Sequence, residues 1–249
     1  MSDDPQKIAE AISKLLPVEK AYDDLAQRPM REAGGALTDL VKAGRLVLMG
    51  PIQLLAAYQD RYTRFLERVA GKVPEENRIE VHPQIAGPTL EGLRYADEED
   101  VLTEYMINLL ACAMDKTRVQ DAHPAFPGLA RQLSTDEAMI LFHLKKQNYA
   151  LKEFARYHAE TNLFSPRETV ANEFPTSALL QPQFFRVYMD HLYHLGLAGI
   201  WQRGNQPPTY DADGKQNGVN IESGIQLTPL GHMFVRACVP DTLPVRTGS

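Results

Sequence analysis

The part of the sequence that most constrains the fold is an ordered series of helix and strand signals in its last third. A helix is predicted from about Gln183 to the residue before Gly196, because glycine suits the left-handed conformation that ends many helices. Two strands are predicted at 197–202 and 219–227, and the segment between them is polar and rich in Pro, Gly, Asp and Asn. Thr228-Pro229 then begins a final helix. Helix, strand, long turn, strand and helix is the order of a winged-helix domain.

Helical periodicity dominates the earlier part of the chain. Apolar residues recur every three or four positions between 55 and 69, as in an amphipathic helix. Four carboxylates at 97–100 precede a second apolar stripe, and negative charge is favoured at a helix N-terminus. Residues 134–137 have the spacing of a capping box. The predicted fold class is therefore mainly α, with a helical N-terminal domain at 1–133, a winged-helix-like domain with a β-hairpin wing at 134–240 and a mobile tail at 241–249.

Two stretches lack a clear period. Prolines and glycines between 73 and 88 predict an ordered connector without a helix, followed by a short helix around 90–95. The segment 152–181 is interrupted by prolines that include Pro166 and Pro175. No defined element is predicted there.

Composition and charge limit the classes of partner. The chain has 249 residues, 44% of them hydrophobic, and can bury a core of ordinary size. Its formal net charge is -6, and neither half is basic. Because phosphate neutralisation supplies most non-specific affinity for nucleic acids, DNA binding would require a local basic patch. The sequence shows no strong patch of this kind.

Cysteine usage and hydropathy indicate the compartment. Cys112 and Cys238 each lie within an apolar run and are predicted to be buried free thiols. The sequence opens without a secretory leader, which indicates a cytoplasmic protein. The uncharged stretch at 46–58 is interrupted by Gly50-Pro51 and is too short to cross about 30 Å of hydrocarbon.

A winged-helix domain would favour DNA binding, with Gln183 and Arg186 on the recognition helix and Arg203 and Lys215 at the wing. Two features oppose this hypothesis. The helix carries more aromatic and apolar residues than a groove-reading helix normally does, and two aspartates in the wing would face phosphate unfavourably. Protein contact or dimer formation is at least as well supported, because a fold does not dictate its use.

The amphipathic region at 37–69 allows a membrane hypothesis. Leu55, Phe65 and Val69 would face the lipid, and the nearby arginines would face anionic headgroups. Core packing against neighbouring helices explains the same pattern, and we favour core packing.

Candidate chemical groups are few. His191 and His194 are spaced as two metal ligands on one helix, but no third ligand or cysteine pair accompanies them. His123, with Asp115 and Asp121 upstream, has the residue types of an acid–base pair, and a loop held by its own hydrogen bonds explains it better. Nucleotide-binding and hydrolase motifs are absent, although an unfamiliar nuclease or nucleotidase stays an alternative. We predict no catalytic residue, metal, cofactor or small-molecule ligand.

Three stretches carry a family resemblance. The middle one is the most specific, because a Leu-Leu-Ala run followed by Met-Asp and then His-Pro is not a generic helical pattern. The stretches are, in chain order, 74–95, 109–138, and 195–197 with 227–234. Together they resemble the Abi-alpha family, the abortive infection alpha proteins of bacteria, over most of the chain.

The resemblance implies participation in bacterial phage defence, and it brings no catalytic residues to this chain. We therefore expect an anti-phage protein that acts by abortive infection without catalysis, through a protein partner or through self-association. A DNA-binding winged-helix regulator is one alternative. A membrane-perturbing effector that uses residues 37–69 is the other.

Overall fold

The computed structural model describes residues 64–93 and 96–243. The chain divides into two compact units, with the boundary between Arg131 and Gln132. We refer to the described residues before this boundary as unit 1 and to those after it as unit 2. The boundary predicted from the sequence stands between Leu133 and Ser134.

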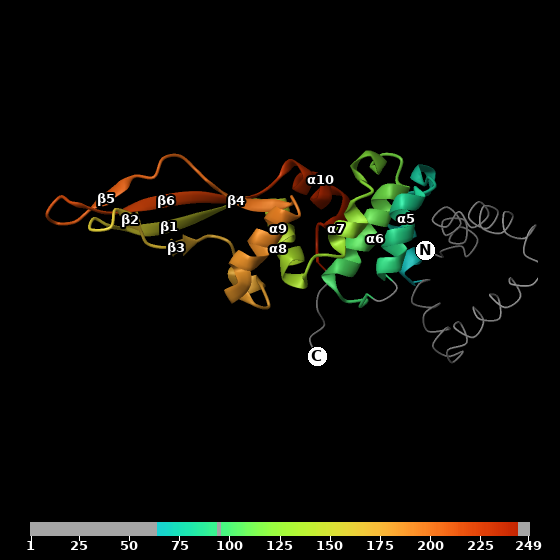
Figure 1. Cartoon of the computed structure of the whole chain (residues 1–249). Helices are drawn as coiled ribbons and strands as arrows, with labels where there is room; N and C mark the ends of the chain where they lie inside the picture. Colours follow the sequence, from blue (N-terminus) through green and yellow to red (C-terminus); the bar gives the residue numbers. More distant parts are fainter. Residues whose placement is uncertain (1–63, 94–95, 244–249) are drawn as a thin grey trace, which may run out of the picture. The chain divides into compact units, whose positions relative to one another are not determined.

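Unit 1 is built from helices. Residues 64–71 are helical, and α6 (Val101–Met114) is buried on nearly every side because its sequence is apolar around the helix. α6 packs with α5 and α7 (Figure 1). Phe65, Tyr105 and Phe126 are among the fully buried side chains of this core. The other elements are η1 (Glu75–Asn77), α5 (Pro83–Leu93), η2 (Val119–Asp121) and α7 (Phe126–Ala130).

The acidic run before α6 acts as the sequence predicts. The side chain of Asp100 accepts a hydrogen bond from the Leu102 amide at 3.1 Å and caps the helix. Inside the same helix, Glu104 is buried and forms ion pairs with Arg68 and, at 4.0 Å, with Lys72. Charge at this helix start therefore has a structural explanation.

The predicted connector at 73–88 is only partly correct, because α5 begins at Pro83 and contains Pro88. Proline fits the first turn of a helix, where its missing N–H has no partner in any case. Pro88 is tolerated further inside because the residue before it is Gly87, which has no Cβ to clash with the proline ring. The short helix predicted at 90–95 is the end of α5, which stops at Leu93. Residues 94–95 lie outside the described residues.

Unit 2 combines helices with a six-stranded antiparallel sheet. Its helical elements are α8 (Thr135–Lys146), η3 (Thr176–Ala178), η4 (Pro182–Phe184), α9 (Phe185–His194) and α10 (Pro229–Cys238). Its strands are β1 (Tyr149–His158), β2 (Leu163–Phe164), β3 (Glu168–Asn172), β4 (Ala198–Gln202), β5 (Pro208–Tyr210) and β6 (Gln216–Leu227).

Two long strands, β1 and β6, form the centre of the sheet. They pair with Leu151 opposite Ser223 and Glu153 opposite Ile221. The outer side of β1 pairs with β2 and β3, and the outer side of β6 pairs with β4 and β5. Figure 1 shows α8, α9 and α10 gathered at the end of the sheet that carries β4, while the end with β2 and β5 extends away from them.

The predicted fold class, mainly α with a winged-helix-like C-terminal domain, is therefore wrong. The two strands predicted at 197–202 and 219–227 are present, but β5 lies within the predicted turn between them, and β1, β2 and β3 add a second half to the sheet. Alternate residues of β1 are buried, and one of them is Glu153, so a charged residue hides the period of two expected for a strand. Pro166 lies in the turn between β2 and β3 and not within a strand.

One face of the sheet packs under the helices. Because side chains alternate along a strand, Leu151 and Glu153 of β1 share a face with Ile221, Ser223 and Ile225 of β6. All five residues are buried.

An aromatic cluster packs between the strands and the helices. Phe174, after β3, stacks on Phe185 of α9 with ring centroids 5.1 Å apart and meets Tyr149 of β1 edge-on. His143 of α8 meets the same phenylalanine ring edge-on at 5.5 Å. The segment without predicted elements thus supplies a central core residue.

The helix ends of unit 2 agree with the sequence. Ser134 and Glu137 form the predicted capping box at the start of α8. Gly196 has a φ of 69° after α9, and Thr228 caps α10 by accepting from the Gly231 amide at 2.8 Å. In the region predicted as a tail, Asp241 accepts a hydrogen bond from Lys145 at 2.7 Å, and residues 244–249 lie outside the described residues.

Candidate functional site

The most structured polar cluster of unit 2 joins the first turn of α8 to α9. Glu137 is buried, and its Oε2 accepts hydrogen bonds from the Ser134 amide at 2.7 Å and the Ser134 hydroxyl at 2.9 Å. Its Oε1 lies 2.6 Å from Nδ1 of His191 on α9. One carboxylate therefore caps α8 and fixes the rotation of the His191 ring.

The neighbouring carboxylate holds the chain that leads into α9. Asp136 is buried and accepts hydrogen bonds from the amides of Leu180 at 2.7 Å and Gln181 at 2.9 Å. The Tyr188 phenol also interacts with Asp136. Desolvation, hydrogen bonding to Asp136 and the nearby charges of Asp136 and Glu137 raise the pKa of Tyr188 above its ordinary value.

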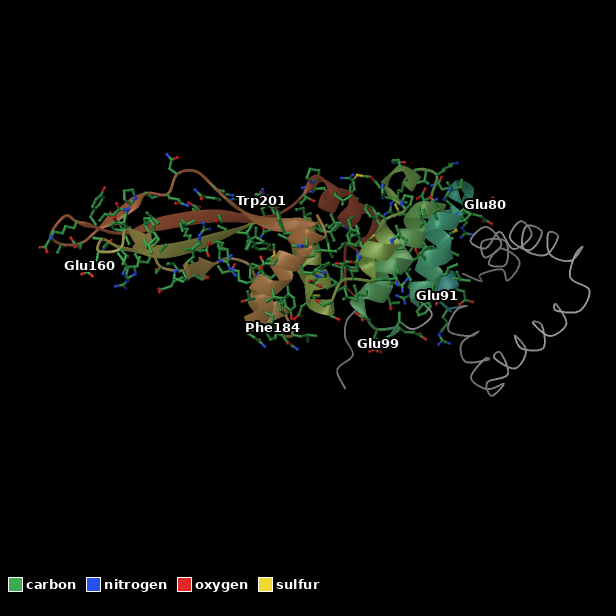
Figure 2. The ribbon with its side chains drawn as sticks, in the orientation of Figure 1. Glu80, Glu91, Glu99, Glu160, Phe184 and Trp201 are labelled. Atoms are coloured by element: carbon green, nitrogen blue, oxygen red, sulfur yellow. The ribbon has the colours of Figure 1, made fainter. Side chains whose placement is uncertain are left out.

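Beside this cluster lie three apolar side chains that face solvent. Leu180, Phe184 and Val187 are 62%, 45% and 60% exposed, and we call them the α9 face. Phe184 and Val187 are three residues apart and therefore neighbours on the helix surface. Figure 2 shows Phe184 at the outer edge of unit 2, away from the strands.

The α9 face is supported from behind. Phe185, Met189 and Leu192 are buried on the opposite side of α9 and anchor it to the core. The Phe184 ring meets the Tyr188 ring edge-on, with centroids 6.5 Å apart. Phe184 and Val187 are thus held on helical elements, and Leu180 lies in the segment that Asp136 holds.

Other exposed apolar residues do not gather in the same way. Leu163 and Phe164 are consecutive on β2 and point to opposite sides of the strand. Phe164 packs its ring against Tyr157 at 5.2 Å. Val170 lies on β3 and Tyr210 on β5, which are separate outer strands. The α9 face is the more concentrated surface.

The His191 and Glu137 pair also has a chemical capacity. A histidine whose Nδ1 contacts a buried carboxylate is held in one orientation, and its other ring nitrogen can then exchange a proton with a ligand. The His191 side chain is 41% exposed. His194, the second histidine of the predicted metal spacing, is exposed. Within the described ranges, no group of three or more His, Cys, Asp or Glu residues could hold a metal ion.

His123 lies in a loop held by its own hydrogen bonds, as expected. Its Nδ1 accepts from the Ala125 amide at 3.1 Å, and its ring meets Phe126 at 5.5 Å. Asp115, upstream, accepts from the amide and the hydroxyl of Thr117. These contacts stabilise the turns of unit 1.

The four residues predicted to contact DNA do not form one surface. Arg186 on α9 is paired with the buried Glu153, whereas the guanidinium of Arg203 lies over Gly224. Gly224 and Glu153 belong to opposite faces of the sheet, because Gly224 pairs with Ala150 in the β1 register. Gln183 is exposed in η4, and Lys215 lies in the turn before β6.

The residues of the membrane hypothesis lie in unit 1 or outside the described residues. Phe65 and Val69 are 1% and 0% exposed and belong to the core of unit 1. Leu55 falls outside the described residues. None of the helices in the described ranges is both long and apolar enough to cross a bilayer.

Sequence reasoning missed the α9 face and its supports. The available signal was an excess of apolar residues on α9: Phe185, Met189 and Leu192 fill the buried stripe, and Phe184 and Val187 fall outside it. The roles of Asp136 and Glu153 depend on partners more than thirty residues away in sequence, so no local pattern indicates them.

Comparison with known proteins gives a family-level match. The family model Abi_alpha, described as abortive infection alpha, matches residues 57–238, which is more than half of the chain. No curated protein and no solved structure matches the chain.

Proposed function

The chain belongs to the abortive infection alpha family, and from this membership we propose that it acts in abortive infection without catalysis, by binding another protein through the α9 face. Family membership supports the process, which is defence against phage. The surface of unit 2 supports the mode of action, since the family description specifies none.

The observation that carries the proposal is the exposure of Leu180, Phe184 and Val187 on α9 and the segment that leads into it. Exposed apolar side chains that lie near one another on an ordered surface are typical of protein contact sites. Binding to an ordered surface also costs less conformational entropy than binding to a mobile one. The hydrogen bonds from Asp136 to the segment before η4 supply that order.

The size of the surface favours a transient contact with a different protein. Permanent homodimers bury roughly 2,000 Å² or more through large apolar interfaces. Three exposed apolar side chains provide too little apolar area for such an interface. We therefore propose a partner that presents a few apolar side chains of its own and binds when infection makes it available.

A matched pair of variants tests the proposal. Val187→Lys places a charge in the α9 face, and Val170→Lys makes the same change at a valine of similar exposure on the outer strand β3. Lysine is tolerated on exposed helices and on edge strands, so both variants are expected to fold. Circular dichroism and the fluorescence of Trp201, the single tryptophan, check this expectation.

Each variant is then expressed in a phage-sensitive bacterium, and plating efficiency and culture survival are measured at low and high multiplicity. The wild-type chain should protect at low multiplicity while the culture collapses at high multiplicity. Val187→Lys should lose protection, and Val170→Lys should keep it. Retained protection in Val187→Lys, or equal loss in both variants, would contradict a contact at the α9 face.

The His191 and Glu137 pair supplies the second candidate, an acid–base function in catalysis. His191→Gln separates the two candidates, because glutamine can still hydrogen bond to Glu137 but cannot transfer a proton near neutral pH. Protection by a folded His191→Gln chain supports the non-catalytic proposal. Loss of protection with an unchanged fold would favour catalysis.

A further inference from the structure

Unit 2 contains a buried carboxylate that meets two arginines. Glu153 lies at the centre of β1, and its side chain is 0% exposed. Its Oε1 forms an ion pair with Arg186 of α9, and its Oε2 lies 3.8 Å from Nη1 of Arg167, which precedes β3. We infer that Arg167 and Arg186, positioned by Glu153, form a binding site for one phosphate group of a small ligand.

The charges do not balance within this cluster. One arginine neutralises one carboxylate, so the second leaves a net charge of about +1. Both arginine side chains are half exposed, at 51% for Arg167 and 48% for Arg186. A structural ion pair with Glu153 would need only Arg186. It does not explain the presence of Arg167.

The hydrogen-bond donors of the two arginines are largely available. A guanidinium has five N–H donors. Within the described residues, the side chain of Arg167 makes no hydrogen bond to protein, because its contact with Glu153 is a longer ion pair. Arg186 makes one hydrogen bond, to Oε1 of Glu153. Two partly exposed guanidinium groups can therefore donate to the same anion.

The site also has unsatisfied polar atoms beneath it. Oε2 of Glu153 and Oγ of Ser223 are buried and make no hydrogen bond within the described residues. Ser223 lies diagonally across the sheet from Glu153 on the same face. Buried polar atoms are normally paired, so these two unpaired atoms need an explanation that the packing of the fold does not supply.

The chemistry of the donors selects phosphate. Arginine forms two parallel hydrogen bonds with phosphate or carboxylate oxygens. A carboxylate offers only two oxygens to the two arginines, whereas a phosphate offers more and can accept a two-bond fork from each. The sequence predicts no small-molecule ligand, and this inference differs from that prediction.

The surrounding charges favour a small ligand over nucleic acid. Glu168 follows Arg167 directly, and Asp190 lies one turn after Arg186 on α9. Asp190 is exposed and would repel a further phosphate beside the bound one, whereas Glu168 pairs with Phe154 and lies on the opposite face of the sheet from Glu153. Arg156, the neighbouring exposed arginine of β1, lies on the opposite face of the sheet from Glu153.

The test measures phosphate binding to the full chain by equilibrium dialysis. Arg167→Gln is the main variant, because it leaves the pair between Arg186 and Glu153 intact and should fold. Arg156→Gln is the matched control. We expect saturable binding of inorganic phosphate and of AMP, at least about tenfold weaker in Arg167→Gln and changed less than about twofold in Arg156→Gln.

Three results would overturn the inference. The first is the absence of saturable binding at about 10 mM phosphate or AMP. The second is an equal loss of phosphate binding in Arg167→Gln and Arg156→Gln. The third is binding of a single-stranded DNA 20-mer that is much tighter than binding of AMP and is unchanged in Arg167→Gln. The inference does not rest on the proposed function. Val187→Lys should bind phosphate as the wild type does, so a failure of the α9 face leaves this site intact.

Discussion

Asp136 is the residue whose removal should most directly disorder the α9 face. It is buried at the start of α8, accepts hydrogen bonds from the amides of Leu180 and Gln181, and interacts with the Tyr188 phenol. Asp136→Ala removes all three contacts without adding bulk. The segment before η4 then loses its attachment to α8.

The expected magnitude follows from these contacts. A hydrogen bond to a charged group contributes about 1.5 to 3 kcal/mol when buried, and about 1 kcal/mol each is appropriate here because the freed amides can reach water. Three contacts give about 3 kcal/mol lower stability for unit 2. Each 1.4 kcal/mol corresponds to a factor of ten, so amide exchange at Leu180 and Gln181 should accelerate about 100-fold.

Hydrogen exchange followed by mass spectrometry or NMR measures the local effect. Urea unfolding followed by Trp201 fluorescence measures the stability of unit 2, because the single tryptophan lies on β4. Asp100→Ala is the matched control, since the Asp100 carboxylate also accepts a hydrogen bond from a backbone amide but belongs to unit 1. It should leave the Trp201 transition unchanged.

Two results would refute the reasoning. Unchanged exchange at Leu180 and Gln181 in Asp136→Ala would mean that the carboxylate does not hold this segment. Destabilisation of the Trp201 transition by Asp100→Ala would mean that the effect is not local. If the reasoning holds, Asp136→Ala should also weaken protection against phage, although every exposed apolar residue is still present.

Three further predictions concern packing and ionisation. Gly231→Ala should lower the stability of unit 2 by about 2 to 3 kcal/mol, because the new Cβ would lie 1.8 Å from the Leu197 carbonyl oxygen. Gly128→Ala is the control, because the new Cβ would lie in open space and should not lower stability. The midpoints of urea unfolding of the two variants and the wild type measure the difference. Cys112 should react with iodoacetamide at pH 8 about 100-fold more slowly than a free thiol, as followed by peptide mass spectrometry, because desolvation raises its pKa to about 11. Desolvation also lowers the pKa of His143 below 6.5, so the unfolded chain binds the proton more readily and the free energy of unfolding should fall as pH drops below 6.5. His143→Gln should reduce the difference in free energy of unfolding between pH 7.5 and pH 5.5, as measured by urea titrations.

Local features of the fold were predictable from the sequence. The caps at Asp100, Ser134 and Thr228 and the left-handed Gly196 each depend on residues within a few positions of one another. The two strands before and after the long turn were found for the same reason. Cys112 and Cys238 are buried and are not joined in a disulfide, as predicted.

The features that were missed depend on distant partners. β1 is a strand because β6 supplies its pairing partner some seventy residues later, with Tyr149 opposite Ile225. Glu153 can occupy a buried position of β1 only because Arg186 reaches it from α9. A pattern of period two that includes a charged residue does not look like a buried strand until that partner is known.

Three polar residues of α9 share one property, which bears on the function of this helix. Arg186, Tyr188 and His191 each contact a carboxylate that is buried, namely Glu153, Asp136 and Glu137 respectively. Burying a carboxylate costs free energy that its partner only partly returns, and apolar packing would often be more stable. Three such contacts on one ten-residue helix therefore fix its rotation and position at a cost in stability. The same rotation leaves Phe184 and Val187 45% and 60% exposed, so much of their apolar surface gains nothing from burial. A helix that is held firmly while its apolar residues stay exposed is better explained by a contact with another molecule than by the stability of this chain alone.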